Sequence, residues 1–100
     1  MRLEDVDFNA VRALQALLET RSVTLAARRL GTTQPNMSRS LARLRELFGD
    51  PLFVSTGRTL EPTPFALHLE PDVERALWAM RLVFERGSGT SKEDSPPPLR

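Results

Sequence analysis

The chain has 100 residues, which is enough for one small domain with an appendage. It has no cysteine and a single histidine, so we expect no disulfide framework, no thiol nucleophile, no enzyme active site and no cofactor. No apolar run approaches the roughly 20 residues that cross a bilayer, and the first residues are too acidic for a signal peptide. These features predict a cytoplasmic protein.

The net charge of +1 says little about partners, but the charge is distributed unevenly. Between Arg21 and Arg58 there are seven arginines and two acidic residues, a local charge of +5. The flanking segments are neutral to acidic. A basic middle of this kind is typical of a surface that binds a polyanion. A solvated arginine-rich surface with no ligand is the alternative.

Apolar residues at helical spacing predict short helices in the first third of the chain. A stripe that runs from Phe8 to Leu18 predicts the first helix, and Asp7 is a good N-cap for it. Ser22 can cap a short second helix, which Gly31 closes because glycine accepts the left-handed conformation that follows many helices.

The third helix is predicted to begin after Thr33, because threonine is a good N-cap and Pro35 costs nothing in a first turn. Gly49 ends the helix. The residues expected to form its buried stripe are Met37, Leu41, Leu44 and Phe48. The opposite side presents Pro35, Arg39, Ala42, Arg43 and Glu46.

A small hairpin and a fourth helix are predicted next. Residues 52–54 and 59–61 are short extended runs around a polar tip that contains Gly57. Thr63 and Pro64 then pair an N-cap with proline at the first helical position, so the fourth helix is expected to begin there.

The fourth helix is predicted to run to about residue 86 and to have a heptad seam. The candidate dimer interface on this helix consists of Phe65, Leu69, Val73, Ala76, Met80 and Val83. Acidic residues early in the helix and basic residues late in it favour an antiparallel homodimer. From residue 87 the sequence is polar and rich in proline, which is typical of a flexible tail over residues 87–100.

Two short helices joined by a turn with glycine, the second with outward arginines, suggest a helix-turn-helix. Four segments follow one another along the chain, and as an ordered set they are more specific than any single motif: SVTLAARRL at 22–30, TQPNMSRSLARL at 33–44, GDPLF at 49–53 and RTLEPTP at 58–64. Together they resemble the amino-terminal domain of LysR-type transcriptional regulators. The resemblance covers roughly residues 5–86.

This resemblance implies a fold dominated by α-helices. A winged helix-turn-helix of three helices and a β-hairpin would occupy residues 1–62, and a linker or dimerisation helix would occupy residues 63–86. The family also has a carboxy-terminal effector-binding domain, which this sequence lacks, so a small-molecule effector would act only through that absent domain. A full-length protein could form a higher oligomer.

The resemblance implies sequence-specific binding of double-stranded DNA, with the third helix in the major groove and the wing in the minor groove. The candidate DNA-binding residues are Ser22, Thr24, Thr32, Thr33, Gln34, Pro35, Asn36, Ser38, Arg39, Arg43 and Arg58. Two positions depart from the family's pattern. Asn36 stands where a small or apolar residue is usual, and Ser55 stands where a second wing arginine is frequent, so Arg58 would carry more of the wing's binding.

The chemistry of these side chains suits such a role. Amides such as Gln34 and Asn36 can pair with adenine, while Arg39 and Arg43 can reach guanine or phosphate. Hydroxyl groups at helix starts can hold phosphates, and an arginine at a hairpin tip such as Arg58 suits a narrow minor groove. Helix capping and ordinary surface polarity are the alternatives for the same residues.

A second function stays open at this point. The chain could be a protein-interaction module that dimerises through residues 63–86 and modulates full-length regulators. Binding to DNA weakens steeply with salt, whereas a hydrophobic helix interface barely responds, so a salt titration distinguishes the two.

Overall fold

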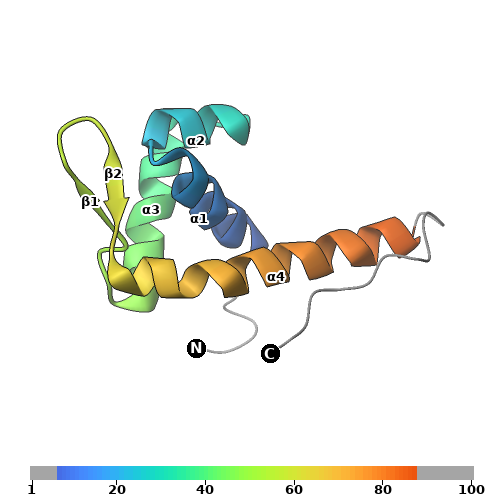
Figure 1. Ribbon diagram of the computed structural model, residues 1–100. Helices are drawn as coiled ribbons and strands as arrows, with labels where there is room; N and C mark the ends of the chain where they lie inside the picture. The colour runs from blue at the N-terminus through green and yellow to red at the C-terminus, as the bar shows by residue number, and fades with distance from the viewer. Residues whose placement is uncertain (1–6, 88–100) are drawn as a thin grey trace.

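The computed structural model describes residues 7–87, so the predicted tail over residues 87–100 lies outside it except for Gly87. Its elements are α1 (Phe8–Thr20), α2 (Val23–Arg29), α3 (Gln34–Phe48), β1 (Phe53–Ser55), β2 (Leu60–Pro62) and α4 (Pro64–Gly87). Helices α1 to α3 form a body with the hairpin at one end, and α4 runs along the body and projects past it (Figure 1). This arrangement confirms the predicted winged helix-turn-helix with a long fourth helix.

Side-chain caps begin the first three helices at the residues that the sequence predicts. The Asp7 carboxylate accepts the backbone N–H of Asn9 at 2.9 Å. Ser22 and Thr33 each accept the N–H three residues further on, at 3.1 and 3.2 Å. These contacts satisfy backbone donors that have no partner within the helix, which is why each helix begins where it does.

The core lies between α1 and its neighbours. Leu14 and Leu17 of α1 are 1% and 0% exposed, and Met37 of α3 is 2% exposed. Ala26 and Ala27 of α2 are also buried, and their small side chains allow α2 to pack closely against the other helices. The apolar stripes read from the sequence are therefore the faces that the structure buries.

The hairpin pairs Phe53 with Pro62, Val54 with Glu61 and Ser55 with Leu60, in antiparallel register. Both strands begin one residue later than the predicted runs at residues 52–54 and 59–61.

Leu52 accounts for the later start of the first strand. Its φ of 64° is left-handed, and Phe53 donates its N–H to the Pro51 carbonyl across it at 2.6 Å, which forms a tight γ-turn. A leucine in this conformation is strained, but the side chain is fully buried, and that burial compensates for the strain.

The base of the hairpin is joined to the start of α4 by a contact between Asp50 and Thr63. One carboxylate oxygen of Asp50 accepts the Leu52 N–H and the Thr63 hydroxyl, both at 2.8 Å. The Thr63 oxygen in turn accepts the N–H of Ala66 at 3.1 Å, so it is the N-cap of α4. The Thr63 N–H also donates to the Leu52 carbonyl at 2.9 Å. These bonds fix the direction in which α4 leaves the hairpin.

Helix α4 packs on the body from its first turn to beyond its middle. Ala66 and Val73 belong to the core, and Leu69 and Leu77 pack against it. Val73 and Leu69 of the expected dimer seam are therefore already in contact with their own chain. The sequence reading also overlooked Pro71, which lies inside the helix and has no N–H to donate to the preceding turn.

At 24 residues, α4 is about 36 Å long at the usual helical rise. Across residues 7–87, the structure contains no helix with the length and apolar character needed to span a membrane.

The Asp50–Thr63 contact predicts a stability effect. Thr63→Val keeps the shape of the side chain and removes both of its hydrogen bonds, so the free energy of unfolding should fall by about 1–3 kcal/mol. Urea denaturation measures this change. Thr63→Ser retains the hydroxyl and should stay within about 0.5 kcal/mol of the wild type. A Thr63→Val protein with an unchanged midpoint would contradict the role of this contact.

Candidate nucleic-acid interface

The amino-terminal half of α3 presents a polar outer face. Gln34, Pro35, Asn36 and Arg39 are exposed, whereas Met37 points into the core. Gln34 donates from its amide nitrogen to the hydroxyl of Ser38, one turn further on, at 3.2 Å. The structure thus brings the predicted amide and guanidinium side chains together on one exposed face of one helix.

Asn36 lies at the centre of a second set of contacts on this face. Its amide nitrogen donates to the Thr32 hydroxyl at 3.1 Å, and its amide oxygen accepts a hydrogen bond from the Arg39 guanidinium. Thr32, Asn36 and Arg39 therefore form a continuous chain of hydrogen-bonded side chains. Sequence reasoning proposed each residue separately and did not foresee the contacts among them.

Other predicted residues lie at the edges of this face. Arg43 approaches the Asp7 carboxylate, with 3.8 Å between nitrogen and oxygen, so it leans toward the start of α1. Such an exposed pair is weak and leaves the guanidinium free to exchange partners. Ser22 and Thr33 are occupied as N-caps, while Thr24 is exposed in the first turn of α2.

Arg45 belongs to the basic segment but has a structural role. Its Nε donates to the Pro51 carbonyl at 2.7 Å, and an Nη donates to the Phe53 carbonyl at 3.0 Å. The guanidinium therefore holds the chain that leads from α3 into β1. Because its acceptors lie six and eight residues later and belong to the backbone, no side-chain pattern in the sequence signals this role.

Arg21 also links parts of the fold. Its guanidinium approaches the Glu61 carboxylate of β2 at 3.5 Å, and its carbonyl accepts the Leu60 N–H at 3.0 Å. Arg29 pairs with Glu19 of α1. Of the seven arginines between residues 21 and 58, Arg21, Arg29 and Arg45 thus connect elements of the protein.

The tip of the hairpin carries Arg58. Gly57 before it has a φ of 101°, a conformation that glycine adopts without strain, and Thr56 donates its N–H to the Thr59 carbonyl at 3.0 Å. Arg58 is exposed and makes no hydrogen bond or ion pair to any other residue from 7 to 87. A guanidinium in this position is available for an external anion.

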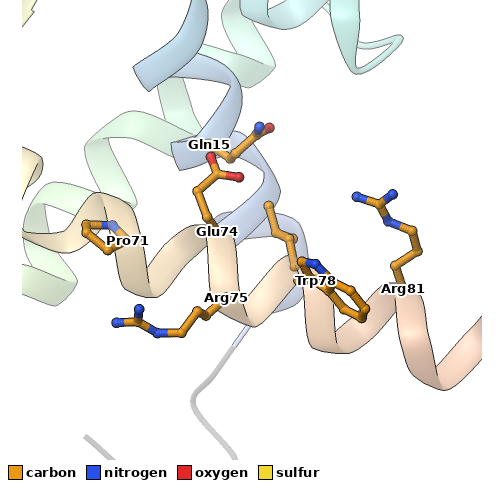
Figure 2. Close-up of a pocket in the computed structure, with 7 residues that line it drawn as sticks. Gln15, Pro71, Glu74, Arg75, Trp78 and Arg81 are labelled. Atoms are coloured by element: carbon orange, nitrogen blue, oxygen red, sulfur yellow. The ribbon is translucent and has the colours of Figure 1, made fainter. Parts of the chain in front are cut away.

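A separate groove of about 480 Å³ lies between α1 and α4. Figure 2 shows the Glu74 side chain reaching from α4 toward Gln15 of α1, with Trp78 and Arg81 further along the helix. No nucleophile and base meet among the residues that line it. In the part of the chain that the structure describes, no three histidine or acidic side chains gather to hold a metal ion.

Comparison with known sequences gives consistent results. Residues 8–67 match the family model of bacterial regulatory helix-turn-helix proteins, lysR family. The chain is 52% identical over 77 residues to nodulation protein D 2 of Sinorhizobium fredii. It is 46% identical over 85 residues to the HTH-type transcriptional activator NahR of Pseudomonas putida. These matches cover 77% and 85% of this chain but 25% and 28% of the relatives, so the chain spans about a quarter of their length.

Solved structures share the fold. A probable transcriptional regulator from Pseudomonas aeruginosa aligns with a TM-score of 0.79 at 34% identity, covering 84% of this chain and 28% of that one. The CbnR_DBD–DNA complex aligns at 0.75 with 24% identity, over 84% of this chain and 97% of that one. The BenM_DBD/catB site 1 DNA complex aligns at 0.75 with 24% identity, over 89% and 100%. At these identities the two complexes show the fold alone.

Arg45, which binds backbone carbonyls, and Arg58, which is exposed at the hairpin tip, are expected to differ in their effect on the free energy of unfolding. Arg45→Met removes the donors to two backbone carbonyls while keeping an unbranched stem, so the free energy of unfolding should fall by about 1–3 kcal/mol. Arg58→Met makes the same chemical change at the hairpin tip and should stay within about 0.5 kcal/mol of the wild type. Urea denaturation of both variants measures the difference. Equal losses would mean that Arg45 has no special structural role.

Proposed function

Because the chain belongs to the lysR family of bacterial regulatory helix-turn-helix proteins, we propose that it binds double-stranded DNA with sequence specificity. It does so as the DNA-binding portion of a transcriptional regulator. The observation that carries this proposal is the outer face of α3, where Gln34, Asn36 and Arg39 stand exposed on a rigid, well-capped helix. Two solved structures with this fold, CbnR_DBD and BenM_DBD, are complexes with DNA, which supports the proposal.

The proposed docking follows from the dimensions of DNA. The major groove admits one α-helix, and the amino-terminal part of α3 is the part with base-reading side chains. Thr32 and Thr33 precede that helix, where hydroxyl groups and free backbone N–H groups can bind phosphates. The hairpin of β1 and β2 stands to one side of α3 (Figure 1), and Arg58 at its tip would enter the adjacent minor groove, whose negative potential attracts a guanidinium.

The family consists of transcriptional regulators. We propose that this chain is likewise no enzyme and acts on the bacterial chromosome in the cytoplasm.

Selection from random duplexes and a salt titration test the function. The wild-type protein should enrich a defined sequence, and its affinity for that duplex should fall linearly with salt on logarithmic axes, because bound phosphates release counterions. Fluorescence anisotropy with labelled duplexes measures the affinity. A protein that enriches no sequence and shows no salt-dependent binding would overturn the proposal and leave the interaction module as the function.

Arg58 is expected to supply affinity rather than base discrimination. Arg58→Ala should weaken binding to all duplexes by a similar factor and reduce the salt slope by about one unit. Arg86→Ala, at the far end of α4, makes the same change in net charge and should leave the slope unaltered. The assignment to the wing is wrong if Arg58→Ala abolishes discrimination at one base pair and leaves non-specific affinity intact.

We also propose that the chain forms a homodimer through α4, with residues 63–86 as the dimerisation helix and residues 1–62 as the DNA-binding unit. The second half of α4 projects past the body (Figure 1), and Val83 there is 66% exposed. Val73 and Leu69 already pack against their own chain, and the Phe65 ring meets that of Phe48 edge-on, so the surface left for a partner consists of Ala76, Met80 and Val83. Burying such apolar side chains favours association. The α3 helices of the two protomers could then read two half-sites of one DNA duplex.

Val83→Asp tests this interface, because the side chain is exposed in a single chain and its replacement leaves the body folded. The variant should sediment as a monomer at tens of micromolar, where the wild type sediments as a dimer. Leu67→Asp introduces the same charge at an exposed apolar residue on another side of α4 and should remain dimeric. A monomeric wild type, or a dimeric Val83→Asp protein, would contradict the proposed interface.

A further inference from the structure

Asn36 has both ends of its amide engaged by neighbouring side chains. Its nitrogen donates to the Thr32 hydroxyl at 3.1 Å, and its oxygen accepts from an Nη of Arg39. A guanidinium has only donors, so the amide oxygen has to face Arg39, and the nitrogen is then left for Thr32. The orientation of the amide is thus determined by its two partners.

This arrangement is ill-suited to direct base reading by Asn36. An asparagine reads adenine by turning its oxygen and its nitrogen together toward one base edge. Here the oxygen and the nitrogen are directed to two different partners, Arg39 on the following turn and Thr32 before the helix. Turning toward a base would break both contacts.

Arg39, by contrast, gains from the contact. Its long side chain has several rotatable bonds, and fixing such a side chain on binding costs conformational entropy. The Asn36 oxygen holds one nitrogen of the guanidinium, and within residues 7–87 the Arg39 side chain makes no other hydrogen bond. The remaining N–H donors are free to meet two acceptors at once.

We propose that Asn36 is a positioning residue that holds the Arg39 guanidinium ready to read guanine, and that Asn36 does not itself read a base. Guanine presents two acceptors, O6 and N7, on its major-groove edge, and this pair matches a guanidinium that only donates. The proposal rests on the proposed DNA-binding function and identifies the base that this part of α3 recognises.

The test compares base preferences after selection from random duplexes. Arg39→Ala should abolish a preference for guanine at one position, a loss of about 5- to 150-fold in discrimination. Asn36→Ala should reduce the preference at that same position by about two- to tenfold. In the double variant, the loss should be no larger than with Arg39→Ala alone, because Asn36 acts only through Arg39.

Two further variants separate positioning from a general structural effect. Asn36→Asp keeps an oxygen that accepts from Arg39, so it should retain the guanine preference even though the added charge lowers affinity for every duplex. Gln34→Ala removes a neighbouring amide whose partner is Ser38, and it should leave the preference at the Arg39 position unchanged. Circular dichroism checks that α3 stays folded, which we expect because Asn36 is exposed and alanine favours helix.

The outcomes distinguish this proposal from the broader function. If Asn36→Ala removes an adenine preference at a different position, and the losses of the two single variants add, then Asn36 reads a base and the inference is wrong. If Asn36→Ala and Arg39→Ala lower affinity equally for all sequences, both residues contact phosphate and the inference is also wrong. A wild-type protein that selects no sequence would overturn the proposed function itself.

Discussion

The burial of Leu14 and Leu17 in α1 is the contact on which the rest of the fold depends. Helices α2, α3 and α4 all pack against α1, and these two side chains are almost wholly excluded from water. Burying a leucine stabilises a fold by about 1.5–3 kcal/mol, a large share of the stability of a small domain. Because each neighbouring helix turns its apolar stripe toward α1, its polar residues face outward. The exposed face of α3 is therefore a consequence of the core.

Most of the fold could be predicted from the sequence because its signals are local. Helix caps such as Asp7 and Thr33 act on backbone groups two or three residues away, and their identity alone marks a helix start. The strand boundaries were wrong by one residue because they depend on Leu52, whose left-handed backbone is tolerated only where its side chain is buried. The packing of Val73 was missed for a related reason. The same stripe fits a partner helix and the chain's own α1, and periodicity does not distinguish them.

The candidate site could be predicted as a set of residues but not as an arrangement. The sequence indicates that Asn36 and Arg39 lie on the outer face of a helix, since their spacing relative to Met37 determines this. Which of them contacts the other depends on side-chain rotamers, which periodicity does not contain. The structural role of Arg45 could not be predicted from the sequence either, because the backbone carbonyls that it binds come close only when the chain turns back after α3.

The hydrogen bond from the Leu60 N–H to the Arg21 carbonyl joins the start of β2 to the carboxyl end of α1. The base of the wing is thus fastened to the helix that supports the core, while the tip at Gly57 and Arg58 is held only by contacts within the hairpin. Hydrogen exchange in such a molecule would be graded along the wing. The Leu60 amide would open with the core, and amides at the tip would exchange through local fluctuations. In the proposed complex with DNA, the tip would therefore be the part that adjusts to variable groove widths, while the base of the hairpin keeps a constant position relative to α3.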